Sequence, residues 1–214
     1  MIKILLVDDH DLVRTGIRLI LDSEKAFDVV AEANSGEQAI KICRSHDLDI
    51  VLMDMNMPGM GGLEATRKIL RHDPDAKVIF LSMYKENPIP AKVMQVGAWG
   101  FVTKDAEPKE MVKAILQVHA GQKYIAPDVA QQIALGKLDA GGVDPFKHLS
   151  EREMQIMMML TRGSKVPDIA IQLNISAKTV NTYRYRMFEK LGVTGDVELT
   201  HLALRHKIIS PDQL

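Results

Sequence analysis

Short apolar runs alternate with amphipathic stretches through the first half of the chain. The amphipathic stretches carry apolar residues along one side of a helix, as Leu12, Val13, Ile17 and Ile20 do in the first of them. The apolar runs are short and bounded by turn residues, which is typical of strands buried on both faces. The predicted strands span residues 2–7, 29–33, 50–53, 78–81 and 101–102, and the predicted helices span roughly 11–22, 36–44, 63–72, 89–96 and 108–120.

This alternation predicts an α/β fold built from βαβ units with right-handed crossovers. Five strands give a five-stranded doubly wound parallel sheet with helices on both faces. A further helix is expected from Pro127 to about Leu135, and residues 136–148, rich in Gly, Asp and Pro, indicate a linker. From Leu149 the pattern is helical only. We therefore expect an α/β domain at 1–121, a linker with a short helix at 122–147 and a small all-α domain at 148–214.

Composition narrows the class of protein without identifying it. The chain has 214 residues, 46% of them hydrophobic and 26% charged, with a net charge of -1, which suits two ordinary globular domains. Cys43 is the only cysteine, so an internal disulfide is excluded and a reducing compartment, the cytoplasm, is expected. The N-terminal pattern differs from that of a signal peptide, and no apolar stretch has the length that spans a bilayer, so no membrane partner is expected.

Polar side chains follow four of the predicted strands at the point where each strand ends. Asp8 and Asp9 follow the first strand, Asp54 the third, Ser82 the fourth and Lys104 the fifth. Because sites in doubly wound sheets form at the carboxyl ends of the strands, we expect these side chains to lie together. Each residue taken alone is commonly a cap, a turn residue or a solvated charge. It is their joint placement that favours a functional site.

Three clustered carboxylates repel one another, and a hard cation such as Mg²⁺ is the usual remedy. Asp9 and Asp54 are the expected direct ligands, with Asp8 acting through water and the backbone carbonyl of Asn56 as a further ligand. A carboxylate beside Mg²⁺ can attack phosphorus and form an acyl phosphate. Lys104 and Ser82 then suit the phosphoryl oxygens, by charge and by hydrogen bonding.

The C-terminal part carries clear helix signals and one cationic helix. Ser150 and Glu153 form a capping-box pattern, and Ser176 precedes the long stretch 177–191. In that stretch Val180, Met187 and Leu191 share one face, while Lys178, Thr182 and Tyr185 lie nearly opposite. A solvated charged face is the ordinary explanation. The short helix and tight turn before it, and the mixture of cations with amide and hydroxyl groups, favour contact with a DNA major groove.

The stretches "LLVDDHDLVRTGI", "VLMDMNMPGMGGLE", "VIFLS" and "GAWGFVTKD" resemble the receiver domain of two-component response regulators, over residues 1–121. The resemblance implies a flavodoxin-like fold. It also implies roles for particular residues: Asp54 as phosphoacceptor, Asp8 and Asp9 as the acid pair, Ser82 and Lys104 as the phosphate-sensing pair, and Phe101 as the switch aromatic. One departure is Asp105, which stands where many receivers have proline.

The stretches "LSEREMQIMMMLTRG" and "IAIQLNISAKTVNTYRYRMFEKLGV" resemble the LuxR-type helix-turn-helix, over residues 148 to about 208. We expect the DNA backbone to be contacted by Lys178, Thr179, Arg184 and Arg186, and the bases by Asn181, Thr182 and Tyr185. Arg184 borders the apolar face of its helix, so it either reaches a phosphate or packs on a partner. Tyr183 departs from the histidine common in that family. Because one copy offers few cations, we expect a homodimer on an inverted repeat, paired through the last helix.

Taken together, the halves resemble a response regulator of the NarL/FixJ class and are similar to its GacA/UvrY type. That resemblance implies a hybrid sensor histidine kinase as phosphodonor and double-stranded promoter DNA as target. The predicted function is phosphorylation-controlled transcription regulation, not enzymatic turnover.

Two alternatives stay open. One is a phosphatase of the haloacid-dehalogenase type, which Asn56 argues against because that type has an acid two positions after its nucleophile. The other is a DNA-binding protein with a purely structural receiver.

Overall fold

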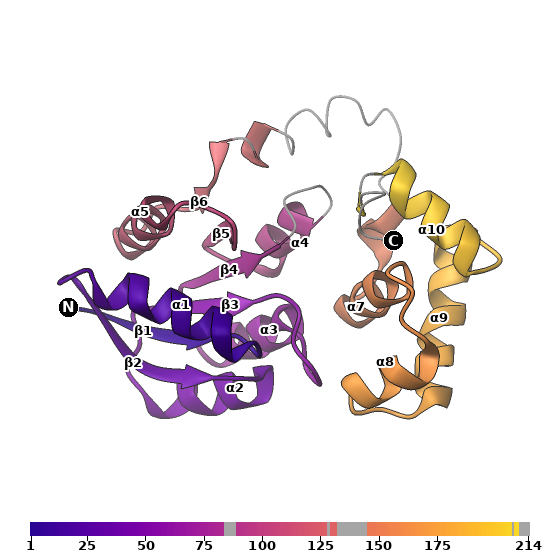
Figure 1. Cartoon of the computed structure of the whole chain (residues 1–214), viewed down its shortest axis with the longest axis horizontal. Coiled ribbons are helices and arrows are strands. Elements are labelled where there is room, and N and C mark those ends of the chain that lie inside the picture. The colour runs from indigo at the N-terminus through magenta and orange to yellow at the C-terminus, as the bar shows by residue number, and fades with distance from the viewer. Residues whose placement is uncertain (84–88, 128, 132–144, 207, 210–214) are drawn as a thin grey trace. The chain divides into compact units, whose positions relative to one another are not determined.

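The computed structural model describes residues 1–83, 89–127, 129–131, 145–206 and 208–209. The chain divides into two compact units, Met1–Lys85 with Val93–Ala130 and Glu86–Lys92 with Gln131–Leu214 (Figure 1). The division passes through the helix α4. The helix predicted from Pro127 to about Leu135, and the linker predicted around it, lie for the most part outside the described residues.

The first unit is built on a six-stranded sheet in which every described pair of neighbours is parallel. The α/β fold class is confirmed, with one strand more than expected, the short strand at 124–125. The order is β2-β1-β3-β4-β5-β6, and the strands are β1 (Ile2–Val7), β2 (Phe27–Ala33), β3 (Ile50–Asp54), β4 (Val78–Ser82), β5 (Gly100–Thr103) and β6 (Tyr124–Ile125).

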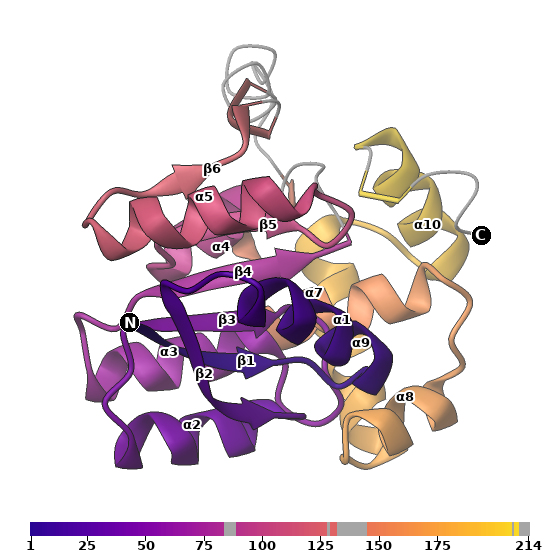
Figure 2. The same cartoon turned by 60° about the vertical axis from the view of Figure 1, so that its left-hand side comes forward.

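Helices cover both faces of this sheet (Figure 2). Alternate strand residues such as Ile4 and Leu6 pack with Ile17 of α1 and Ile115 of α5 in one apolar cluster. The helices α2 and α3 lie next to each other on the opposite face. Among the described residues, the bounded helices of this part of the chain are α1 (Asp11–Asp22), α2 (Gly36–Ser45), α3 (Gly62–His72), α4 (Ile89–Val96) and α5 (Pro108–His119).

The central strands β3 and β4 are buried along their whole length. This explains their continuous apolar runs, because a strand covered by helices on both faces has no solvent-facing side. Each run ends in a polar residue, Asp54 in β3 and Ser82 in β4. The polar ends of neighbouring parallel strands therefore meet at one edge of the sheet.

The second unit is helical, with a short 3₁₀ turn η1 (Pro145–His148) before its helices. The Ser150 hydroxyl accepts a hydrogen bond from the backbone N–H of Glu153, and the Glu153 carboxylate accepts one from the backbone N–H of Ser150. These two bonds confirm the predicted capping box. Buried methionines, among them Met154 and Met157, fill the small core. Within the described range 145–206, the helices are α7 (Glu151–Leu160), α8 (Val166–Gln172), α9 (Ala177–Leu191) and α10 (Asp196–Arg205).

The long helix α9 begins and ends where the sequence predicts. The Ser176 hydroxyl accepts a hydrogen bond from the Thr179 backbone, and Gly192 stops the helix in the left-handed conformation, with φ 66°. Lys190, in its last turn, lies 2.6 Å from the buried carboxylate of Glu153. Burial would raise the pKa of Glu153, but Lys190 and the Ser150 bonds outweigh it and hold that pKa below its usual value.

Candidate functional site

Two aspartates from neighbouring strands meet at the carboxyl end of the sheet. Asp8 follows β1 directly, and Asp54 is the last residue of β3, which pairs with β1 through Val7 and Met53. Asp8 is fully buried and Asp54 is 3% exposed. The Oδ1 atom of Asp8 accepts a hydrogen bond of 2.9 Å from the backbone N–H of His10, which fixes the turn after the strand.

Lys104 joins the two carboxylates. Its Nζ lies 2.6 Å from Asp8 Oδ2 and 2.9 Å from Asp54 Oδ1, and only 8% of its side chain is exposed. The backbone N–H of Lys104 donates a hydrogen bond of 2.8 Å to the carbonyl of Ser82, so the pairing of β5 with β4 sets where the lysine emerges. Residues from three distant parts of the sequence therefore form one buried ion cluster.

Burial dominates the electrostatics of this cluster. It raises the pKa of Asp54 to about 7; Lys104 opposes that rise, and Asp8 and Asp9 add to it. For Lys104, burial lowers the pKa, but Asp54 and Asp8 more than compensate, and its pKa is raised above the usual value. The ammonium therefore stays charged, while Asp54 is held close to the point at which it takes up a proton.

Asp54 keeps one oxygen available. Its Oδ2 atom is buried and accepts no hydrogen bond from the part of the chain that the structure describes. A buried carboxylate oxygen without a partner carries a free-energy cost unless a cation or an added group compensates it.

The remaining predicted residues of the first unit lie nearby, with differences in their contacts. Ser82 ends β4, is 1% exposed, and its hydroxyl is 4.0 Å from the sulfur of Met55. Asn56 is half-buried in the loop after β3. Phe101, the expected switch aromatic, is fully buried.

A close backbone contact positions Asp54, and the sequence analysis missed it. Gly62, at the start of α3, lies so near the end of β3 that a Cβ atom there would be 2.1 Å from the carbonyl oxygen of Asp54. The N–H of Gly62 donates to the carbonyl of Met55 at 3.0 Å. Glycine is therefore required where α3 closes over the strand end. The doubled glycine at 61–62 was the available signal.

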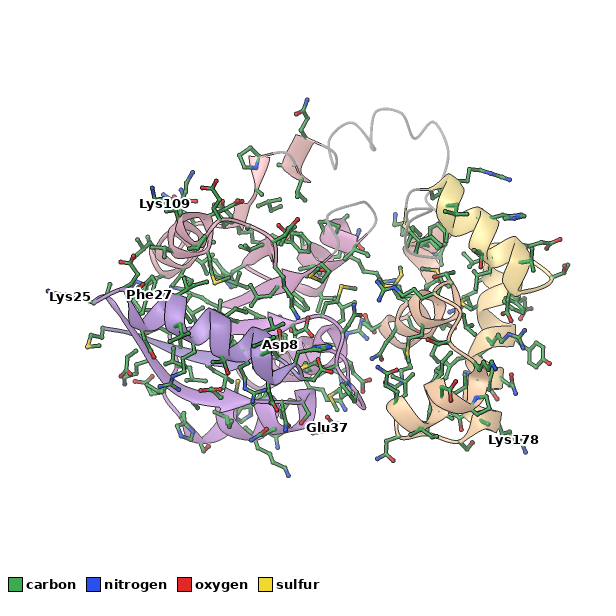
Figure 3. All side chains as sticks on the ribbon, in the orientation of Figure 1. Asp8, Lys25, Phe27, Glu37, Lys109 and Lys178 are labelled. Atoms are coloured by element: carbon green, nitrogen blue, oxygen red, sulfur yellow. The ribbon has the colours of Figure 1, made fainter. Side chains whose placement is uncertain are left out.

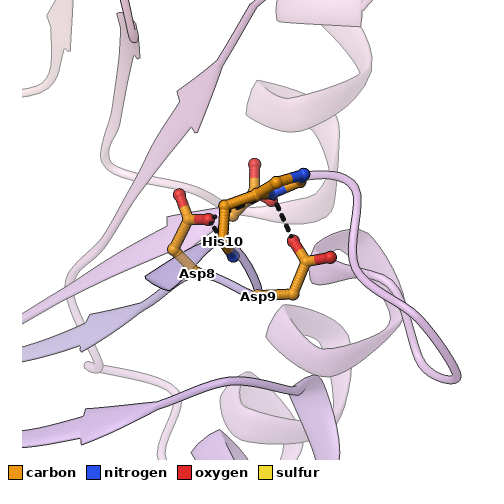
Figure 4. A group of neighbouring side chains, drawn as sticks. Asp8, Asp9 and His10 are labelled. Atoms are coloured by element: carbon orange, nitrogen blue, oxygen red, sulfur yellow. Dashed lines mark hydrogen bonds and ion pairs between the residues drawn. The ribbon is translucent and has the colours of Figure 1, made fainter. Parts of the chain in front are cut away.

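His10 also lies at the site and was not predicted there. Its Nδ1 atom is 3.0 Å from Asp9 Oδ1 and 3.5 Å from Asp8 Oδ1, and Figure 4 shows the ring reaching over toward the carboxylate of Asp9. One donor atom each from Asp8, Asp9, His10 and Asp54 lie within 4.8 Å of one another. The available signal was the direct succession Asp8-Asp9-His10 after a strand.

In the second unit, α9 presents the predicted polar face. Val180 and Met187 are buried in the core, whereas Lys178, Tyr185 and Arg186 are exposed. Figure 3 shows the side chain of Lys178 pointing away from the helices of this unit. Among the other predicted residues, Thr182 is exposed, and Thr179 and Asn181 are half-buried.

Arg184 is engaged within the unit. Its guanidinium makes two bonds to Asp196 of α10, of 2.8 Å and 2.6 Å, and lies 5.2 Å from the centre of the Phe188 ring. This two-pronged geometry ties α9 to the start of α10. We expected Arg184 to contact the DNA backbone, but its guanidinium is already bonded to Asp196.

The two units define a class of protein. Residues 4–116 match the family described as response regulator receiver domain, and residues 147–203 match the family described as bacterial regulatory proteins, luxR family. The chain belongs to the response regulators that carry a luxR-type domain. It is a phosphorylation-controlled transcription regulator and not an enzyme.

Two relatives are similar to this chain in sequence over nearly its whole length. The chain is 58% identical to the response regulator UvrY of Escherichia coli (strain K12), over 100% of this chain and 99% of that protein. It is 53% identical to the response regulator GacA of Pseudomonas aeruginosa, over 98% of each.

Solved structures agree with this assignment. One is RcsB from Salmonella enterica serovar Typhimurium bound to a promoter in the presence of the phosphomimetic BeF3-, with a TM-score of 0.68 and 29% identity over 94% of this chain and 96% of that one. Another is a LuxR-family response regulator from Aurantimonas sp. SI85-9A1, with a TM-score of 0.62 and 40% identity over 64% of this chain and 97% of that one. Among the residues described here, no helix is both long and apolar enough to cross a membrane.

Proposed function

We propose that Asp54 accepts a phosphoryl group from a sensor histidine kinase and that this event controls binding to promoter DNA. The observation that carries the proposal is the state of the Asp54 carboxylate. One oxygen is held by Lys104 at 2.9 Å, and the other is buried without a hydrogen-bond partner among the described residues. That arrangement leaves a preorganised nucleophile with one oxygen free to react.

The transfer step balances in a simple way. An oxygen of Asp54 forms a bond to phosphorus while the bond between phosphorus and the donor imidazole nitrogen breaks, and the donor keeps the electron pair. Lys104 lies where its ammonium stabilises the charge on the phosphoryl oxygens. Ser82, at the end of the next strand, is within the same buried edge and supplies a hydroxyl donor.

The carboxylates of Asp8, Asp9 and Asp54 fit a magnesium ion. Asp54 has a buried oxygen without a partner, and Asp8 and Asp9 add hard carboxylate oxygens of the kind that Mg²⁺ prefers. We propose Asp9 and Asp54 as direct ligands, Asp8 through water, and the carbonyl of Asn56 as a further ligand. The ion would supply positive charge that offsets repulsion between the carboxylates and the incoming phosphoryl group.

Phosphorylation of Asp54 would then change how the side chains around it pack. A phosphoryl group on Asp54 adds acceptor oxygens that draw the Ser82 hydroxyl away from Met55. We propose that this movement stabilises the buried position of Phe101 and so shifts the population between two packings of the surface formed by α4 and α5. Phosphorylation then selects a state that is already accessible to the unmodified chain.

On DNA, we propose that α9 enters the major groove. Lys178, Thr179 and Arg186 would contact phosphates, and Asn181, Thr182 and Tyr185 would contact bases. We propose that Arg184 instead holds α9 against α10 through its bonds to Asp196. A homodimer on an inverted repeat is proposed because few cations are exposed on one copy, and the RcsB structures with promoter DNA support this use of the domain.

The organisation of the chain follows from these roles. We propose a receiver domain at 1–121, a linker with a short helix at 122–147 and the DNA-binding domain at 148–214. We propose a hybrid sensor kinase as the phosphodonor, which is what the resemblance to the GacA/UvrY type implies. The cytoplasm, where promoter DNA is found, is the proposed location.

Intact mass measurement tests the first step. The full chain is incubated with Mg²⁺ and acetyl phosphate, and we expect one phosphoryl group on the wild type and none on Asp54→Asn. DNA binding is then titrated with duplexes selected from a random pool by the labelled protein. We expect labelling to tighten binding for the wild type and to leave Asp54→Asn unchanged.

Other outcomes would favour the alternatives. Continuous release of inorganic phosphate would indicate a phosphatase-like enzyme. Equal DNA binding with and without labelling would indicate a receiver that is only structural. A phosphate response that persists in Asp54→Asn would place the phosphoacceptor elsewhere and end the proposal.

A further inference from the structure

Arg14, in the first turn of α1, holds the backbone of the turn that carries the acid pair. Its guanidinium Nη1 donates a hydrogen bond of 2.8 Å to the backbone carbonyl of Asp8. Its own backbone N–H donates to the carbonyl of His10 at 2.9 Å. The turn from Asp8 to His10, with Asp9 in its middle, is therefore tied to one residue at both ends.

The side chain of Arg14 takes over where the pairing of β1 with β2 ends. The last residue pair of these strands is Val7 with Ala33, and the backbone N–H of Asp8 still donates to the carbonyl of Ala33, at 3.1 Å. The carbonyl of Asp8 accepts its hydrogen bond from Arg14 instead. Because Asp8 is fully buried and a buried carbonyl needs a donor, Arg14 satisfies a group that lies beyond the end of the strand pairing.

Glu32 of β2 fixes the position of the guanidinium. The Nε atom of Arg14 donates to Glu32 Oε2 at 2.9 Å, and its Nη2 atom donates to Asp11 Oδ1 at 2.6 Å. The other oxygen of Glu32 accepts from Arg18, also at 2.6 Å. Arg18 and Arg14 hold the pKa of Glu32 below its usual value, although burial would raise it. Each of the three guanidinium nitrogens of Arg14 thus has its own acceptor, and only 17% of the side chain is exposed.

We propose that Arg14 is a positioning residue for the acid pair and that it fixes the orientation of Asp9. The peptide unit between Asp8 and Asp9 is planar, so a bond that holds the Asp8 carbonyl also fixes the N–H of Asp9. The carboxylate of Asp8 is anchored separately, by the backbone N–H of His10 and by the ammonium of Lys104. The loss of Arg14 therefore acts mainly on Asp9. The inference rests on the proposed function in one respect, that Asp9 is a ligand of Mg²⁺.

A displaced ligand weakens metal binding more than the chemistry that follows it. Mg²⁺ requires nearly ideal octahedral geometry, and groups that orient metal ligands commonly contribute about 10–100-fold to affinity. Arg14 should thus set the Mg²⁺ concentration that labelling requires. The labelling rate in saturating Mg²⁺ should depend on it little, because Asp54 and Lys104 keep their own contact.

The variant Arg14→Lys separates these effects. Lysine keeps the positive charge, but its single ammonium cannot reproduce the planar fork that reaches all three acceptors. Mg²⁺ binding to the full chain is measured by calorimetry, and labelling by acetyl phosphate is followed over a range of Mg²⁺ concentrations. Arg18→Lys is the matched control, because Arg18 bonds the same Glu32 carboxylate and reaches Asp22 instead of Asp8.

We expect Arg14→Lys to raise both the Mg²⁺ dissociation constant and the half-saturating Mg²⁺ concentration about tenfold, with less than about a threefold change in the labelling rate at saturation. Arg18→Lys should match the wild type in all three quantities. A role in stability alone would lower the melting temperature of Arg14→Lys and leave its Mg²⁺ affinity unchanged. That result, or equal losses of affinity in the two variants, would overturn the proposal.

Arg14→Ala adds a test in which charge and position act in opposite directions. Removing a cation near the acid pair would tighten Mg²⁺ binding if charge alone mattered. Because Arg14 positions Asp9, we expect Arg14→Ala to bind Mg²⁺ at least as weakly as Arg14→Lys. Tighter binding than in the wild type would contradict the positioning role.

The two proposals can fail separately. If acetyl phosphate labels neither the wild type nor the variants, the phosphoacceptor role of Asp54 fails, while calorimetry still reports on Arg14. If the wild type is labelled and Arg14→Lys binds Mg²⁺ equally well, only the role of Arg14 is lost.

Discussion

At the scale of single residues, Asp54 of the receiver unit is a buried carboxyl group whose charged form is disfavoured by its surroundings. Its carboxylate is 3% exposed, and burial raises its pKa to about 7 despite the nearby ammonium of Lys104. A carboxyl group whose pKa is higher in the folded than in the unfolded chain binds its proton more tightly in the folded state. Stability therefore falls as the pH rises from about 4, the unfolded value, to about 7, and the penalty is fully present above that.

We expect Asp54→Asn to raise the melting temperature of the metal-free chain at pH 8 and to have a much smaller effect at pH 4.5. The amide cannot ionise, so it removes a penalty that exists only when Asp54 is charged, on the order of 1–4 kcal/mol. Melting in EDTA at the two pH values measures this. A gain of the same size at both pH values would contradict the account.

Gly62 is the second residue whose identity the site requires. We expect Gly62→Ala to destabilise the receiver unit by about 2 kcal/mol or more and to slow labelling at Asp54, because the added methyl would collide with the carbonyl of Asp54. Gly16→Ala is the control: a Cβ there has nothing within 4 Å, and alanine favours the helix α1. Urea denaturation with intact-mass labelling would show the contrast, and similar stabilities for the two variants would refute it.

At the scale of elements, Arg184 and Asp196 determine how α9 is held against α10. Most surface ion pairs add little to stability, but paired bonds of 2.8 Å and 2.6 Å are the geometry in which such a pair matters. The pair connects the middle of α9 to the first residue of α10. A change at Asp196 should therefore reach the DNA through the orientation of α9.

Asp196→Asn gives two opposite expectations. If only charge mattered, removing an acid near DNA would tighten binding. Because Asp196 positions α9, we expect binding to weaken about fivefold, roughly 1 kcal/mol. Glu189→Gln removes an exposed acid from the same helix without that bond and should bind equally well or more tightly. Anisotropy titrations at one salt concentration compare them, and tighter binding by Asp196→Asn would disprove the positioning role.

The elements themselves were largely predictable from the sequence. Strands such as β3 and β4 are continuous apolar runs, and Ser150 and Ser176 mark helix starts by local hydrogen bonds, so neighbouring residues carry the information. The strand β2 starts at Phe27, two residues before its expected start, because the exposed Asp28 interrupts the apolar run. The two-residue strand β6 carries no pattern of its own.

The site was predictable only in part. Asp8, Asp54, Ser82 and Lys104 could be brought together because each ends a strand, and parallel strands end at one edge. The pairing of Arg184 with Asp196 and the approach of Gly62 to the Asp54 backbone depend on how helices pack, and no local pattern in the sequence encodes those distances. His10 was overlooked because its neighbours already accounted for the expected ion.

At the scale of the whole molecule, the charge is nearly balanced at -1, so net charge alone does not draw the chain to DNA. The proposed attraction depends on the cations that α9 exposes. Lys178 and Arg186 are the exposed cations among the proposed contacts. About two phosphate contacts for one copy correspond to weak, salt-sensitive binding. Pairing two copies on one site is the straightforward way to increase the affinity.

We expect phosphorylation to steepen the salt dependence of DNA binding. The slope of log affinity against log salt should be roughly -2 for the unlabelled chain and roughly -4 after labelling, as two copies engage. Titrations at four or more salt concentrations, with and without acetyl phosphate, measure both slopes. Lys178→Ala should reduce each slope, and an unchanged slope after labelling would argue against dimer formation on DNA.

The ion cluster of Asp8, Asp54 and Lys104 draws on strands β1 and β3 and on the residue after β5. During synthesis the two acids leave the ribosome well before the lysine that neutralises them. A nascent chain that ends before residue 104 thus carries an uncompensated pair of acids, so its competence to receive a signal arises only after about half of the 214 residues have been made. Shortened products that end before Lys104 should therefore not be labelled at Asp54.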